Sequence, residues 1–108
     1  MVVTVELSII PIGESASAGK LIAQAIRELE TFGVKYEVTP MSTIFETEDI
    51  EGAFEVAKAA HEAVFLGSDG KIRRVITTVK IDDRREVERS MEDRVASGKE
   101  AVEAEEQD

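Results

Sequence analysis

The segment Lys35–Glu46, with the sequence KYEVTPMSTIFE, decides the fold that we predict for this chain. Apolar and polar side chains alternate from Val34 to Thr39, which is the pattern of a strand with one buried face. Pro40 interrupts the alternation, and a second short strand is predicted from Met41 to Thr47. The segment therefore predicts two neighbouring strands joined by a tight connection.

Further strands and helices are predicted on both sides of this double strand, from the hydrophobic period and from capping and breaking residues. Before the double strand we predict a strand over Val2–Ile10, which Pro11 and Gly13 end, and a helix that Ser17 caps and that ends at Thr31 before Gly33. After the double strand we predict a helix that Asp49 caps and Gly67 ends, and then a strand over Lys71–Ile81. A last helix is predicted to begin near Asp82 or Asp83. The last helix carries only a narrow apolar stripe, which Gly98 weakens further.

This order predicts an α+β fold, the ferredoxin-like βαββαβ sandwich, with a C-terminal helix added. Right-handed crossovers place the first two helices on one face of a four-stranded antiparallel sheet and leave the other face uncovered. A chain of 108 residues is the usual size of one domain, so we expect a single domain over residues 1–108.

Composition narrows the class of protein. Hydrophobic residues make up 43% of the chain and charged residues 33%, as in a folded globular domain, and we find neither a membrane-spanning run nor a signal peptide. We therefore expect a cytoplasmic protein. The formal charge of −10 argues against binding to nucleic-acid phosphates, and the aromatic pair that stacks RNA bases is missing.

The uncovered sheet face is predicted to be polar, because the apolar rows of the strands meet the helices. The residues expected there are Thr4, Glu6, Ser8, Lys35, Glu37, Thr39, Ile76, Thr78 and Lys80. The strand after Pro40 leaves two alternatives, since either Thr43 and Phe45 or Ile44 and Glu46 face outward. Such a face is either solvated or buried against a second copy of the chain, with polar pockets between the two.

Known catalytic and metal-binding patterns are not recognised. The chain lacks cysteine, and His61 is its single histidine, which excludes the usual zinc sites. The stretch Gly13–Lys20 has the interval of a phosphate-binding loop, but Leu21 stands where the magnesium-binding hydroxyl is required. We expect no metal, no cofactor and no catalytic residues, although paired carboxylates leave an enzyme as a third hypothesis.

The chain resembles a known family. The residues that carry the resemblance are Val5–Gly13, the double strand Lys35–Glu46, the helical stretch Ala57–Val64 and Lys80–Arg85. In order and spacing they are similar to the thiamine-binding proteins related to YkoF, uncharacterised protein family 0045. That resemblance implies a ferredoxin-like fold, homo-oligomers built as dimers of dimers through the sheets, and non-catalytic binding of thiamine or its hydroxymethylpyrimidine moiety.

The resemblance also implies ligand contacts. Thr43 and Glu46 match the family's Thr-x-x-Glu stretch and are the leading candidates, because a carboxylate can pair with an aminopyrimidine edge. Glu37 and Thr39 come next, followed by Ser15 and Ser17 of the first loop, while residues 82–84 are expected to cap and anchor the last helix. The alternative hypothesis is an oligomeric regulatory or scaffolding module that acts through a partner protein.

Overall fold

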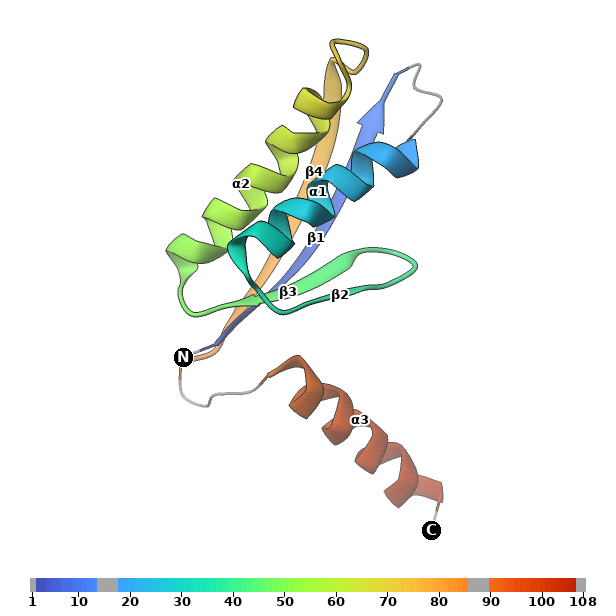
Figure 1. Cartoon of the computed structure of the whole chain (residues 1–108). Helices are drawn as coiled ribbons and strands as arrows, with labels where there is room; N and C mark the ends of the chain where they lie inside the picture. Colours follow the sequence, from blue (N-terminus) through green and yellow to red (C-terminus); the bar gives the residue numbers. More distant parts are fainter. Residues whose placement is uncertain (1, 14–17, 86–89, 107–108) are drawn as a thin grey trace.

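The structure, a computed structural model, describes residues 2–13, 18–85 and 90–106 (Figure 1). The predicted capping residue Ser17 lies outside these ranges. The strands and helices, in chain order, are β1 (Val3–Ile12), α1 (Ala18–Phe32), β2 (Tyr36–Val38), β3 (Thr43–Thr47), α2 (Ile50–Gly67), β4 (Arg74–Asp83) and α3 (Met91–Glu106).

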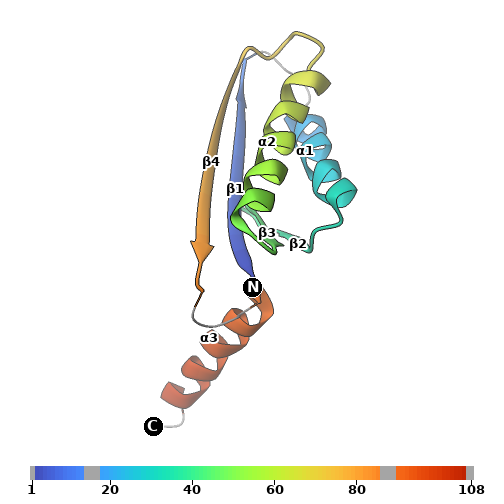
Figure 2. The same cartoon turned by 90° about the vertical axis from the view of Figure 1, so that its left-hand side faces the viewer.

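The sheet has the order β2-β3-β1-β4, and every neighbouring pair of strands is antiparallel. Both α1 and α2 cover the same face of this sheet, and the opposite face is open (Figure 2). This confirms the predicted ferredoxin-like α+β fold with one additional helix. Among the described helices, none has the length and hydropathy needed to cross a membrane.

The core lies between the sheet and these two helices. Its fully buried side chains include Val5 on β1 and Phe45 on β3, which stand directly opposite each other. Leu29 of α1 and Val64 of α2 belong to the same buried cluster. Burial of each such side chain contributes roughly 1.5–3 kcal/mol, so the apolar rows of the strands fix which face meets the helices.

Local signals in the sequence explain the helix ends. Asp49 caps α2, because its side chain accepts a hydrogen bond of 2.7 Å from the backbone N–H of Gly52. Gly33 ends α1 with φ of 69°, and the N–H groups of Gly33 and Val34 donate to the carbonyls of Glu30 and Leu29. The predicted cap at Asp49 and stop at Gly33 are both confirmed.

The strand register settles the alternative that the sequence left open. Ile44 stands opposite Glu6, and Glu46 stands opposite Thr4. Because directly paired residues share a face of the sheet, Ile44 and Glu46 point to the open face. Thr43, opposite Leu7, therefore points toward the helices.

Several predicted boundaries were wrong. β1 does not end at Pro11 but continues to Ile12, and β4 starts later than predicted and reaches Asp83. The last helix starts at Met91 rather than near Asp82 or Asp83, because both of these residues pair with β1. Apolar–polar alternation at Ile81 gave no sign that the strand continued through two aspartates.

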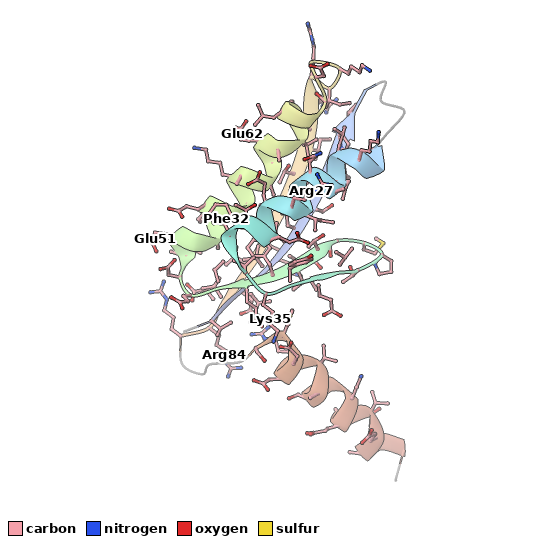
Figure 3. The ribbon with its side chains drawn as sticks, viewed as in Figure 1. Arg27, Phe32, Lys35, Glu51, Glu62 and Arg84 are labelled. Carbon is pink, nitrogen blue, oxygen red and sulfur yellow. The ribbon has the colours of Figure 1, made fainter. Side chains whose placement is uncertain are left out.

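α3 lies beyond the end of the sheet (Figures 1 and 2), and residues of its first turn contact the rest of the domain. Its first backbone N–H, at Met91, donates to Glu46 Oε1 over 2.6 Å, and the Met91 side chain is buried. Two ion pairs join it to the strands, Lys35 with Glu92 and Asp82 with Arg94. In Figure 3, Lys35 is directed from the double strand toward this helix.

Candidate functional site

A cavity of about 200 Å³ lies where α1 passes over β1 and the closed end of the β2–β3 hairpin. We call it the hairpin cavity. Its lining residues are Leu7, Ser8, Ile9, Ile22, Ala25, Ile26, Leu29, Val38, Thr39, Pro40, Met41, Ser42 and Thr43. None of these side chains is charged, so the cavity suits a small, largely apolar guest with few polar groups.

Unequal strand lengths create this cavity. β3 pairs with β1 only from Val3 to Leu7, whereas β1 continues for five more residues along β4. Beyond Leu7 no β3 residue pairs with β1, and the closed end of the β2–β3 hairpin diverges from β1 (Figure 1). The helix α1 covers the gap, and its residues Ile22 and Ile26 lie one helical turn apart.

The hairpin turn is held by Thr39. Its hydroxyl donates to the carbonyl of Ser42 over 2.8 Å and accepts from the N–H groups of Ser42 and Met41 at 3.1 and 3.3 Å. These bonds occupy the donor and acceptor capacity of the hydroxyl. Thr39 therefore lines the cavity but serves the turn.

Two further hydrogen bonds fix the position of the hairpin. The Ser42 hydroxyl donates to Glu6 Oε2 over 3.2 Å, which ties the turn to the open face of β1. The Tyr36 hydroxyl donates to Glu30 Oε1 over 2.7 Å, which ties β2 to α1 and raises the pKa of Tyr36. The cavity walls are thus joined on both sides of the sheet.

Thr43 is the predicted contact that faces the cavity with a free hydroxyl. It is partly buried, and no side-chain hydrogen bond joins its hydroxyl to another residue in the described ranges. A polar group in such a place favours a ligand that can hydrogen-bond to it.

Glu46 lies on the other face of the sheet, three residues along the same strand. Its carboxylate is engaged with the start of α3, and it lines a second, wider hollow of about 430 Å³ beside Lys35 and the first turn of α2. Thr43 and Glu46 therefore do not converge within one subunit. Thr43 and Thr39 are brought together, and Glu46 shares the open face with Glu37, which is opposite Ile44.

The remaining predicted contacts, Ser15 and Ser17, lie outside the described residues. Sequence reasoning missed the apolar wall that Ile22, Ile26 and Met41 give to the cavity. The available signal was the difference in length between the first strand and the strand after Pro40, since an unequal pair leaves part of the longer strand without a neighbour.

Acidic side chains do not gather into a metal site. Within residues 2–13, 18–85 and 90–106, no group of three or more His, Cys, Asp or Glu side chains is placed to hold a metal ion. Asp49 serves as a helix cap, and His61 is packed, with Nδ1 2.6 Å from Thr77 Oγ1 and its ring edge-on to Phe65.

The chain is similar in sequence to the members of a known protein family. The profile of a family described as thiamine-binding protein matches residues 5–99. A UPF0045 protein of Methanothermobacter thermautotrophicus is 45% identical over 102 residues, which make up 93% of this chain and 99% of the relative. The UPF0045 protein YqgV of Bacillus subtilis is 36% identical over 97 residues, covering 85% of this chain and 89% of its own.

Solved structures share the architecture. The hypothetical protein MJ1052 of Methanocaldococcus jannaschii matches with a TM-score of 0.76 at 32% identity, over 89% of this chain and 94% of that one. A domain of unknown function from Bacillus cereus matches with a TM-score of 0.75 at 28% identity, over 87% of this chain and 86% of that one. The resemblance inferred from the sequence is confirmed, and the chain belongs to the thiamine-binding protein family.

Proposed function

We propose that this chain binds thiamine or its hydroxymethylpyrimidine moiety without catalysing a reaction, and that the pyrimidine ring occupies the hairpin cavity. Membership of the thiamine-binding family supports this ligand class. The observation that carries the location is an uncharged cavity whose wall includes Thr43, a residue whose hydroxyl has no side-chain hydrogen bond within residues 2–13, 18–85 and 90–106. As a cytoplasmic binding protein, the chain would sequester or carry the compound.

The size and chemistry of the cavity favour the pyrimidine end of the vitamin. A volume of about 200 Å³ is smaller than the 300–1,000 Å³ of pockets that enclose drug-sized molecules. A flat ring fits between the aliphatic side chains of α1 and the hairpin, with its polar edge toward Thr43. The cationic thiazolium of thiamine would remain outside the uncharged cavity, and the net charge of −10 on the chain favours the approach of a cation.

The carboxylates of the open face enter the proposal in a different way. Glu46 and Glu37 cannot contribute to the hairpin cavity of their own subunit, because they lie across the sheet from it. We propose them as contacts at a homo-oligomer interface, in which the open faces of two copies meet and enclose polar side chains. The exposed Ile10 and Ile76, paired across β1 and β4, supply apolar area for that contact.

Calorimetric titration with thiamine and with hydroxymethylpyrimidine tests the ligand. We expect saturable binding by the wild type and about two- to tenfold weaker binding by Thr43→Val, which keeps the shape but removes one hydrogen bond. Thr31→Val is the matched control, because Thr31 is exposed near the end of α1 and its hydroxyl donates to the carbonyl of Arg27, away from the cavity. Absence of binding by the wild type at millimolar ligand would refute the proposal.

A further inference from the structure

Part of β1 has no strand beside it on the hairpin side. Antiparallel pairing with β3 ends at the pair Leu7 and Thr43, while pairing with β4 continues to Ile12. If β3 began two residues earlier in the same register, Met41 would stand opposite Ile9. Met41 instead belongs to the hairpin turn, where its N–H donates to the hydroxyl of Thr39.

The direction of each backbone group on β1 follows from the hydrogen bonds of β3. The N–H of Glu46 donates to the carbonyl of Lys35, over 3.0 Å, so the backbone groups of Glu46 point toward β2. Since backbone groups alternate sides along a strand, those of Phe45 point toward β1, where Val5 stands opposite. Val5 and every second residue after it on β1 therefore direct their N–H and C=O groups toward the β3 side.

Ile9 is the first residue of β1 whose backbone N–H and C=O point to the β3 side at a position that β3 no longer reaches. Its N–H and C=O both point into the gap, and Ile9 lines the hairpin cavity. No backbone hydrogen bond outside the regular ladders joins Ile9 to another residue in the described ranges. The next residue of the row, Pro11, has no N–H, so Ile9 is the described residue of β1 that offers a complete donor–acceptor pair to the cavity.

Pro11 supports this geometry independently. Proline is excluded from strand positions whose N–H is needed by a neighbour, yet β1 continues through Pro11 while paired with β4. A proline fits here because the N–H at this position would point to the side on which no strand lies. The ladder to β4 is made by the alternate residues, Ser8, Ile10 and Ile12.

We infer that the main chain of Ile9 is the recognition edge of the hairpin cavity. Its N–H donates to, and its C=O accepts from, a planar heterocycle that carries a ring-nitrogen acceptor beside an amino donor. The ligand edge thus takes the place that a β3 residue would have had, and the hydroxyl of Thr43 lies beside it on the same cavity wall. This inference rests on the proposed function and specifies how an aminopyrimidine is selected.

A selectivity follows from this arrangement. A pyrimidine whose 4-amino group is replaced by methyl has nearly the same shape but lacks the donor, and it would leave the Ile9 carbonyl buried without a partner. We expect the methyl analogue to bind at least tenfold more weakly than hydroxymethylpyrimidine. Equal affinities for the two compounds would overturn the inference.

Substitution at position 9 separates the main chain from the side chain. Ile9→Pro removes the cavity-facing N–H and leaves the ladder to β4 intact, as Pro11 already does two residues later. Ile9→Ala is the control, because it removes the same aliphatic side chain and keeps the N–H. Calorimetry should show at least tenfold weaker binding of hydroxymethylpyrimidine by Ile9→Pro than by Ile9→Ala, and equal binding would overturn the inference.

Amide hydrogen exchange tests the same point in the wild type, without relying on a variant that folds. In the free protein the Ile9 amide should exchange faster than those of Ser8 and Ile10, and saturating hydroxymethylpyrimidine should slow it at least tenfold. A protected Ile9 amide in the free protein, or one that the bound ligand leaves unchanged, would contradict the inference. If the wild type binds no pyrimidine at all, the proposed function fails and this inference fails with it.

Discussion

Two threonines of the hairpin cavity have different roles. The Thr39 hydroxyl is fully engaged in the turn, whereas the hydroxyl of Thr43 has no partner among the residues that the structure describes. From the sequence, Thr43 was a leading candidate ligand contact and Thr39 came next. Their separation depends on the turn at Pro40 and Met41, which only the folded hairpin defines.

We predict that Thr39→Val destabilises the protein by roughly 1–3 kcal/mol, because the N–H groups of Met41 and Ser42 lose their side-chain acceptor. The carbonyl of Ser42 loses one of its two donors and keeps the backbone N–H of residue 39. Thr43→Val should change the free energy of unfolding by less than about 0.5 kcal/mol. Urea unfolding monitored by circular dichroism measures both. Equal stabilities of the two variants would show that the turn does not depend on the Thr39 hydroxyl.

Single residues also show what sequence reasoning can and cannot provide. Asp49 and Gly33 were assigned correctly, because a cap and a left-handed stop act within a few residues of chain. The facing of Glu46 could not be assigned, since it depends on how many residues the turn after Pro40 uses. A shift of one residue would have moved Glu46 to the helix side.

Ion pairs of Glu92 and Arg94 join the start of α3 to the rest of the domain. Lys35 holds the pKa of Glu92 below its usual value, and Arg94 does the same for the pKa of Asp82. The pKa of Lys35 is raised, chiefly by its hydrogen bond with Glu92. Acidic residues in the first turn, Glu92 and Asp93, also face the positive end of the helix dipole.

We therefore predict that α3 loses its contact with the sheet on acidification. A carboxylate with a lowered folded-state pKa stabilises the folded state above its unfolded pKa, near pH 4, and this contribution disappears as pH falls through the folded value. The protection of the amides of residues 91–106 against hydrogen exchange, relative to the intrinsic rate at the same pH, should therefore fall below about pH 4 before the sheet unfolds. The same experiment on Glu92→Gln should show a smaller acid effect, and simultaneous loss of α3 and sheet would contradict the prediction.

The ends of helices and strands were predicted well where a residue that terminates regular structure stands at the boundary. They were predicted poorly where pairing with a neighbouring strand determines the boundary. β1 continues through Pro11 and β4 through Asp82 and Asp83, because each strand has a neighbour at those positions. Local propensity favours a turn at proline and a helix start at aspartate. Tertiary pairing reverses both preferences.

The whole molecule has two features that are unusual for an isolated domain. One face of its sheet is open, and α3 extends beyond the body (Figure 2). The radius of gyration is 16.1 Å, compared with about 13 Å expected for a compact chain of this length. A 16-residue helix with few contacts is marginally stable alone in water, so a second copy is expected to support it.

We predict that the protein is a homo-oligomer. A charged side chain introduced on the open face should dissociate it. Light scattering after size exclusion should give a multiple of the 11.8 kDa chain mass, and Ile76→Glu should shift it toward the monomer. Leu66→Glu is the control, because Leu66 is more exposed than Ile76 but lies on α2, away from the open face. A monomeric wild type would exclude this assembly, and a stoichiometric foreign partner would favour a regulatory module.

At this scale the fold could be read from the sequence, whereas the only sequence signal for the cavity was the unequal length of two predicted strands. Hydrophobic periods specify how many layers the domain has and which face of each strand is buried. The cavity depends on where one strand stops beside another, which emerges only when strands of unequal length are paired.

The most direct test of the central claim is a crystal structure of the protein with hydroxymethylpyrimidine. We predict that the ring lies in the hairpin cavity, with its amino group and ring nitrogen within hydrogen-bond distance of the Ile9 main chain and with the Thr43 hydroxyl beside it. A ring bound on the open face against Glu46 or Glu37, with the hairpin cavity empty, would contradict the account.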